Sequence, residues 1–212
     1  MSTPSHSQSA PKVVVFDLGK VLVEFDWTIA ARNLAVHSAL NAEEIHRVLL
    51  KTQPLYQYET GLITTDEFVA GMRVLLGFRG DEKLFAALFS DIFAPINPMI
   101  ALHAELRKRS VPVFIFSNTN DLAINFIRRH FPFFNQFDGY VLSYEHEAMK
   151  PDARLYEVVE ATTGRQGADI LYLDDRPENI ETGLVREWQA VLHESPEKSR
   201  AALIAAGLVG LR

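Results

Sequence analysis

Short apolar runs alternate with longer amphipathic segments over most of the chain. The runs at 13–16, 111–116 and 170–173 are continuous and apolar, which predicts strands buried on both faces of a sheet, and two shorter runs predict further strands. Amphipathic segments of helical length separate the later runs, and this alternation predicts parallel strands joined by helices. The apolar runs fall at residues 13–16, 111–116, 140–142, 170–173 and 189–192.

Residues 27–93 show helical signals and almost no strand pattern. Asn41 and Thr64 are each followed three residues later by a glutamate, which is the capping-box spacing that starts a helix. We expect about four helices in this block, judged from such start signals and from apolar spacing. The next helix is predicted to begin with Asn97 as its N-cap and Pro98 at its first position.

These patterns predict an α/β fold with a Rossmann-like, doubly wound parallel sheet as its core. The helical block lies between the first two strands of the predicted sheet. Insertions at this point commonly form a lid, so we expect an all-helical cap inserted after the first strand. We assign residues 12–26 and 97–212 to the core, residues 27–96 to the cap and the polar residues 1–11 to a disordered tail.

Composition narrows the class of protein. The 212 residues carry a formal charge of −6, which argues against binding to nucleic acid or to an anionic membrane. The absence of cysteine excludes disulfides and thiol catalysis and fits a cytoplasmic location. No apolar run reaches the roughly 18 residues that span a bilayer. We expect a cytoplasmic monomer or weak homodimer that contacts neither nucleic acid nor membrane.

Polar side chains follow the predicted strands where each strand ends. Parallel strands end at one edge of the sheet, so these side chains are expected to lie together, although each alone fits an ordinary turn or helix cap. Clustered carboxylates need a cation, and oxygen ligands favour Mg²⁺. An ionised aspartate facing a phosphate held by Mg²⁺ and a lysine can act as a nucleophile. The residues concerned are Asp17, Ser117, Asn118, Lys150, Asp174 and Asp175.

Four segments carry a family resemblance: FDLGKVL, FSNTN, MKPD and YLDDRPEN. In order and spacing they resemble the four motifs of the haloacid dehalogenase (HAD) superfamily, and the helical insertion resembles the first cap type of that family. The residues of the first two motifs and of the cap segment at 58–61 are similar to the corresponding segments of bacterial sugar-phosphate phosphatases of the glucose-1-phosphate phosphatase type.

The resemblance implies a role for each motif residue. Asp17 would be the nucleophile and a metal ligand, and Lys150 would bridge it to the phosphoryl group. Ser117 and Asn118 would hold that phosphoryl group. The Gly19 carbonyl and Asp175 would be the other direct ligands of the same metal. Asp174 would reach the metal through a water molecule, and Asn179 would brace this loop.

Gly19 departs from the family pattern, because most phosphatases of this superfamily have a second aspartate there as general acid and base. One interpretation is an acidic leaving group, such as the hemiacetal oxygen of a sugar 1-phosphate. In another, the proton comes from a water on Mg²⁺ or from a different side chain, for which the candidates are Glu24, Asp26, His37 and His46.

We therefore expect a Mg²⁺-dependent phosphatase that hydrolyses a small phosphorylated metabolite, with sugar phosphates favoured, through an aspartyl-phosphate on Asp17. Two alternatives follow from the glycine at position 19. One is a 2-haloacid dehalogenase-type hydrolase, which also lacks the second aspartate but needs no metal loop. The other is a non-catalytic phospho-acceptor or ligand-binding module that has lost turnover.

Overall fold

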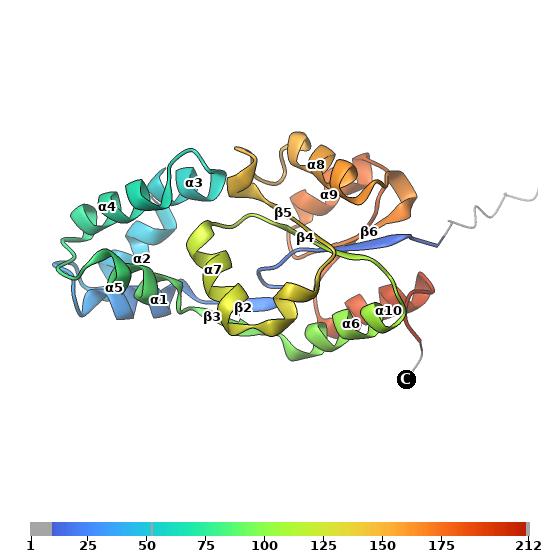
Figure 1. The fold of residues 1–212 in the computed structure, drawn as a ribbon, viewed down its shortest axis with the longest axis horizontal. Coiled ribbons are helices and arrows are strands. Elements are labelled where there is room, and N and C mark those ends of the chain that lie inside the picture. Colours follow the sequence, from blue (N-terminus) through green and yellow to red (C-terminus); the bar gives the residue numbers. More distant parts are fainter. Residues whose placement is uncertain (1–9, 52, 211–212) are drawn as a thin grey trace, which may run out of the picture.

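The computed structural model describes residues 10–51 and 53–210, so most of the predicted N-terminal tail lies outside the described residues. In the described part, five parallel strands form one sheet in the order β5-β4-β1-β6-β7 (Figure 1). This arrangement confirms the predicted α/β fold with a parallel sheet. The strands are β1 (Val13–Phe16), β4 (Val113–Ser117), β5 (Gly139–Leu142), β6 (Ile170–Asp174) and β7 (Gln189–Leu192).

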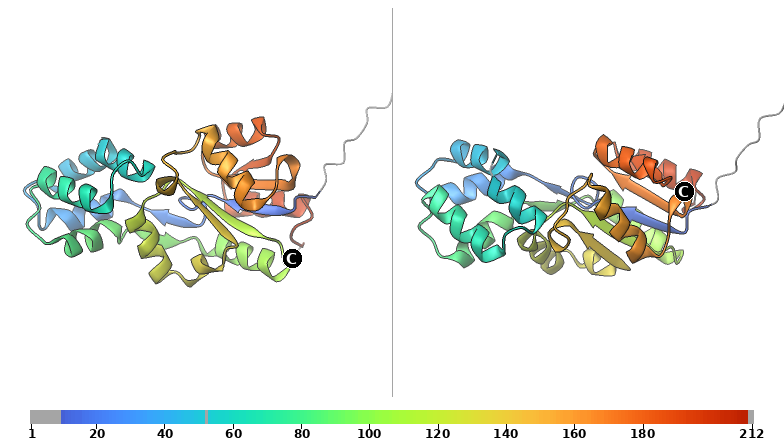
Figure 2. Two further views of the ribbon diagram at one scale, coloured as in Figure 1. Left: turned by 45° about the horizontal axis from the view of Figure 1, so that its top comes forward. Right: turned by 90° about the horizontal axis from the view of Figure 1, so that it is seen from above.

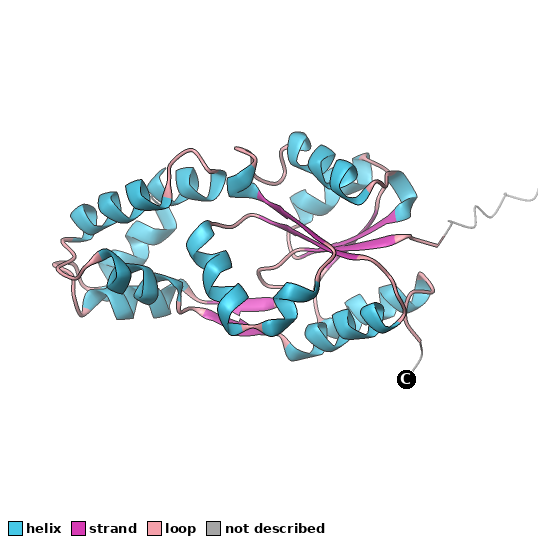
Figure 3. Ribbon diagram, in the orientation of Figure 1, coloured by secondary structure: helices cyan, strands magenta, loops and turns pink. Residues whose placement is uncertain are grey.

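Helices cover both faces of this sheet, as Figure 3 shows by secondary structure. Alternate residues of β1 point to opposite faces. Val14 and Phe16 pack against α6 (Asn97–Lys108), α7 (Asp121–His130) and α10 (Pro196–Ala205). Val13 and Val15 pack on the other face, against α8 (Ala153–Thr163) and α9 (Pro177–Val185). In the described ranges the connections also contain the 3₁₀ helices η1 (Pro132–Gln136), η2 (Ser143–Glu145) and η3 (Gly167–Asp169).

The segment between β1 and α6 forms a separate helical layer, which we call the cap. Its described residues contain α1 (Trp27–Ala35), α2 (Ala42–Lys51), α3 (Gln53–Thr60), α4 (Thr65–Leu76) and α5 (Glu82–Ser90). The cap has an apolar core of its own, with Leu34, Phe68 and Phe85 fully buried. Figure 2 shows it at one end of the molecule, beyond the sheet. These separate cores support the proposed division into a core of residues 12–26 and 97–212 and a cap of residues 27–96.

A short antiparallel ribbon links cap and core. It pairs β2 (Val23–Phe25), which leads into the cap, with β3 (Phe93–Pro95), which leads out of it. Neither of its two strands is among the apolar runs that predict the sheet. No helix among the described residues is long and apolar enough to cross a bilayer.

Most predicted helix starts are confirmed by side-chain hydrogen bonds. Asn97 is the exception, because it is already the first residue of α6 and Ile96 precedes the helix without a side-chain cap. The helix therefore begins one residue earlier than predicted. Ile96, the residue before it, is held next to the ribbon because its N–H donates to the Leu22 carbonyl at 2.9 Å. The predicted caps Asn41 and Thr64 are confirmed, and the structure adds Asp81, Asp152 and Ser195 as side-chain caps of later helices.

Candidate active site

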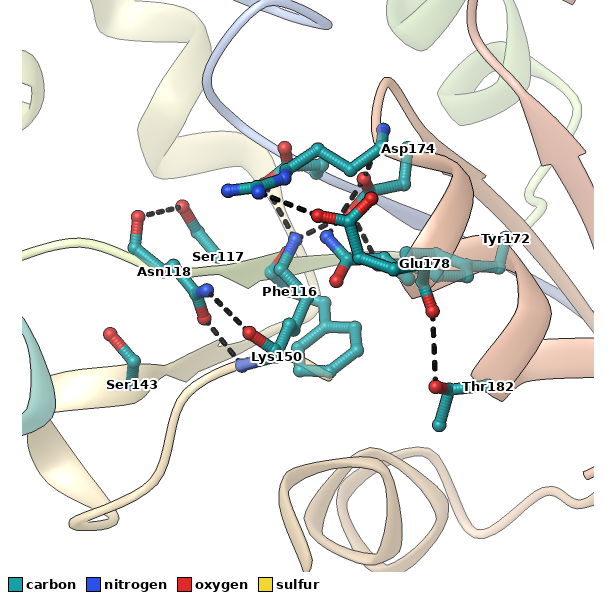
Figure 4. Close-up of polar contacts among 12 residues, drawn as sticks. Phe116, Ser117, Asn118, Ser143, Lys150, Tyr172, Asp174, Glu178 and Thr182 are labelled. Carbon is teal, nitrogen blue, oxygen red and sulfur yellow. Dashed lines mark hydrogen bonds and ion pairs between the residues drawn. The ribbon is translucent and has the colours of Figure 1, made fainter. Parts of the chain in front are cut away.

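The strand ends meet below the cap, as the sequence predicted. Asp17 follows β1 directly, Ser117 ends β4 and Asp174 ends β6. Lys150 reaches them from the loop after η2 (Figure 4). A cavity of about 530 Å³ lies between this edge and the cap, and residues of both parts line it.

Lys150 connects the strand ends. Its Nζ lies 2.9 Å from Asp17 Oδ1 and 2.6 Å from Asp174 Oδ2, and it donates to the Phe116 carbonyl at 2.9 Å. The Lys150 side chain is only 2 % exposed, so these contacts replace its hydration. The two carboxylates outweigh the effect of burial and raise the pKa of Lys150, which therefore stays charged.

The Asp174 carboxylate has its hydrogen-bonding positions filled. One oxygen accepts from Lys150 and from the Tyr172 hydroxyl. The other accepts from the Arg176 N–H at 2.8 Å and from Asn179 Nδ2 at 3.0 Å. Burial alone would raise the pKa of Asp174, but Lys150 and these donors lower it. Asn179 therefore braces this loop, as expected.

Asp17 and Asp175 have fewer partners. Burial raises the pKa of Asp17 to about 7, with Asp174 and Asp175 adding to the rise and Lys150 opposing it. Burial and the charge of Asp174 also raise the pKa of Asp175. Each of the three aspartates offers an oxygen within 4.8 Å of the others, a spacing that can hold a metal ion. Such a set of hard oxygen donors fits Mg²⁺, whose charge would favour the ionised carboxylates.

Ser117 and Asn118 lie at the cavity, but their side chains differ in availability. The Ser117 hydroxyl has only a long contact of 3.4 Å to the neighbouring Asn118 carbonyl. The Asn118 side chain holds the backbone of Lys150, since Nδ2 donates to its carbonyl at 3.0 Å and Oδ1 accepts from its N–H at 2.7 Å. A contact from Asn118 to phosphate would therefore come from its backbone N–H.

Position 19 has no room for a side chain as the structure stands. A Cβ on Gly19 would lie 2.9 Å from Phe25 Cε1, so the Phe25 ring occupies the space that an aspartate would need. Asp26 caps α1 through Thr28, and exposed Glu24 pairs with Lys20 at 2.7 Å. The residues that the sequence offered as a replacement acid do not line the cavity; they are Glu24, Asp26, His37 and His46.

Glu59 lines the cavity but had no predicted role, although it lies in the cap segment at residues 58–61 that carries part of the family resemblance. It lies on α3, one turn after Leu55, and both residues line the cavity. Burial raises the pKa of Glu59 to about 7, partly offset by a hydrogen bond with the Asn120 side chain. The available signal was that resemblance, together with a carboxylate inside the predicted helical block, but neither indicated a role for the side chain.

Apolar side chains from the cap and core dominate the rest of the cavity wall. Among the described residues they are Leu18, Val23, Phe25, Trp27, Leu49, Leu50, Leu55, Phe93, Ala123, Ile127 and Met149.

The family model for haloacid dehalogenase-like hydrolases matches residues 11–184. The chain belongs to this family. The predicted membership of the HAD superfamily is thereby confirmed, and with it the prediction that this HAD-like chain is a hydrolase.

Three relatives show the range of this HAD-like hydrolase's similarities. The sesquiterpene phosphatase astK of Aspergillus oryzae is 26% identical over 172 residues, covering 80% of this chain and 83% of the relative. Phosphatase MT3486 of Mycobacterium tuberculosis is 24% identical over 205 residues, covering 90% and 91%. The crystal structure of the HAD family enzyme BT-2542 of Bacteroides thetaiotaomicron has a TM-score of 0.77 at 24% identity, covering 87% of this chain and 94% of that chain.

Proposed function

We propose that this HAD-like hydrolase is a Mg²⁺-dependent phosphatase that forms an aspartyl-phosphate on Asp17. The observation that carries the proposal is the buried Lys150 held between Asp17 and Asp174, beside a third carboxylate and at the floor of a cavity. Two relatives are named phosphatases, and BT-2542 has also been crystallised with magnesium and inorganic phosphate. Both facts support the same reaction for this chain.

In the proposed reaction an Asp17 oxygen attacks phosphorus and the bond from phosphorus to the ester oxygen breaks. Lys150 keeps Asp17 oriented and offsets negative charge on the phosphoryl oxygens. The Ser117 hydroxyl and the Asn118 N–H hold the phosphoryl group. Water then attacks phosphorus, releasing phosphate and regenerating Asp17.

Mg²⁺ would be held by Asp17, the Gly19 carbonyl and Asp175, and would supply positive charge at the phosphate. We place Asp174 outside direct coordination, bound through water, because four donors already fill its two oxygens. This geometry favours Asp175 over Asp174 as the direct ligand.

The cavity wall favours an apolar organic group on the substrate. A sugar phosphate needs several polar side chains for its hydroxyls, whereas the wall facing the phosphate site is built largely from aliphatic and aromatic side chains. Similarity to a sesquiterpene phosphatase supports the same substrate class. Sugar phosphates stay a prediction from the sequence, and hydrophobic phosphomonoesters are the second candidate class.

The decisive experiment is a phosphate-release screen with Mg²⁺ over sugar phosphates, nucleotides, acyl phosphates and prenyl-type alkyl phosphates. We expect release from at least one class, its loss on adding EDTA, and its loss in Asp17→Asn. Activity that survives chelation or Asp17→Asn would overturn the mechanism. Halide release from a 2-haloacid without any phosphate release would support the dehalogenase alternative, and a phosphorylated Asp17 stable for minutes would support the phospho-acceptor alternative.

A further inference from the structure

The family resemblance implies a general acid and base at position 19, where this chain has a glycine, and the structure offers a replacement on the cap. Resting on the phosphatase function above, we propose that the Glu59 carboxyl protonates the leaving oxygen and later takes a proton from the attacking water. The second aspartate of the usual motif would thereby be replaced by a residue from a different layer of the molecule.

The segment around Glu59 is fixed to the core on both sides of that residue. The Tyr58 hydroxyl accepts a hydrogen bond from the Leu122 N–H at 3.1 Å, at the start of α7. Gly61 has φ +80° and lies so close to Tyr144 that a Cβ would be 2.1 Å from the Tyr144 carbonyl oxygen. Only glycine allows this approach, and the segment therefore keeps a defined position above the core.

A buried serine ties Glu59 to the loop that follows β4. The Ser143 hydroxyl donates to the Glu59 carbonyl at 2.5 Å and accepts from the Thr119 N–H at 2.9 Å. Thr119 stands two residues after Ser117, at the proposed phosphate site. The Glu59 side chain contacts Asn120, the next residue of the same loop. The Glu59 backbone is thus two hydrogen bonds away from the loop that would hold the phosphoryl group.

The other titratable groups of the cavity are already committed. Lys20 pairs with Glu24 and donates to the Phe25 carbonyl at 3.0 Å, and Arg176 pairs with Glu178. Asp17, Lys150 and Asp175 belong to the proposed nucleophile and metal site. Among the described cavity residues, this leaves the carboxyl of Glu59 as the acid with a role still to fill.

The chemistry balances in two steps. In the first, Asp17 bonds to phosphorus, the ester bond breaks, and the Glu59 proton moves to the leaving oxygen to give the alcohol. In the second, a water oxygen bonds to phosphorus, the Asp17–phosphorus bond breaks, and the water proton returns to Glu59. A carboxyl whose pKa lies near 7 is suited to both transfers at neutral pH.

The test compares Glu59→Gln with Glu43→Gln, an exposed cap glutamate on α2 that does not line the cavity. An alkyl phosphate that the wild type hydrolyses has a poor leaving group that needs the proton, whereas p-nitrophenyl phosphate does not. For Glu59→Gln we expect kcat/KM to fall about 10²–10⁴-fold with the alkyl ester and less than about threefold with p-nitrophenyl phosphate. Glu43→Gln should match the wild type with both.

A second readout isolates the dephosphorylation step. With p-nitrophenyl phosphate, Glu59→Gln should release a burst of one nitrophenol per enzyme and then turn over slowly, because water attack lacks its base. Equal losses of kcat/KM for both esters, or the absence of a burst, would overturn the role of Glu59 while leaving the phosphatase intact. A wild type without phosphatase activity would instead refute the function on which the inference rests.

Discussion

Replacing Ser143 by alanine should weaken the junction between cap and core. Ser143 is fully buried at the start of η2, and Figure 4 shows it near the end of the strand that carries Ser117. Its hydroxyl accepts from the Thr119 N–H and donates to the Glu59 carbonyl, with the Thr119 carbonyl as a second acceptor at 3.1 Å. The alanine variant removes this connection without adding bulk.

The expected cost follows from these contacts. The variant leaves the Thr119 N–H, on a residue only 6% exposed, without its partner. A buried donor left unpaired costs about 1–3 kcal/mol, and the lost hydrogen bond to Glu59 adds about 1 kcal/mol. The free energy of unfolding should therefore fall by about 2–4 kcal/mol, and at roughly 2–4 °C per kcal/mol for a chain of this size Tm should drop by about 4–16 °C.

The assay is urea unfolding followed by circular dichroism and tryptophan fluorescence, since Trp27 lies in the cap and Trp188 in the core. Ser38→Ala is the matched control, because the Ser38 hydroxyl donates only within the cap, to the Leu34 carbonyl at 2.8 Å. We expect Ser38→Ala to cost about 0.5–1.5 kcal/mol. A Ser143→Ala loss no larger than that of the control would refute the inferred junction.

Two further substitutions test the cavity. Gly19→Asp should lower the free energy of unfolding by about 1–3 kcal/mol because its Cβ meets Phe25, and adding Phe25→Leu should recover part of that loss; no recovery in urea unfolding would contradict the steric account. Glu59 has a folded pKa of about 7, raised from 4.5, so its stabilising contribution is present below pH 4.5 and is lost as pH rises through 7. Unfolding at pH 5 and pH 8 should therefore show Glu59→Gln gaining about 2–3 kcal/mol over the wild type at the higher pH, and a gain independent of pH would show that the carboxyl is not buried.

The sheet edge could be predicted because parallel strands bring their ends together whatever covers them. Asp17, Ser117 and Asp174 each end an apolar run, and this local pattern was enough to place them at one site. The commitment of the Asn118 side chain to the Lys150 backbone could not be foreseen, because it depends on the path of a loop 32 residues further on.

The cap was harder to predict for a related reason. Residues 53–60 bury only part of one face, with two tyrosines and a proline in place of a regular apolar stripe, so α3 had no clear periodic signal. The contribution of Glu59 to the cavity depends on how α3 docks on the core. That docking depends on Tyr58, Ser143 and Gly61, which contact residues distant in the sequence.

The β2–β3 ribbon has a consequence for substrate entry. The two segments that connect cap and core are β2 and β3, and they are hydrogen-bonded to each other in this ribbon. We therefore expect the ribbon to act as a hinge about which the cap rotates. The hydrogen bonds Ser143–Glu59 and Leu122–Tyr58, which join α3 to the core, would then hold the cap closed. Opening would carry Glu59 away from Asp17, so that the open protein would keep the proposed nucleophile in place but not the proposed proton donor.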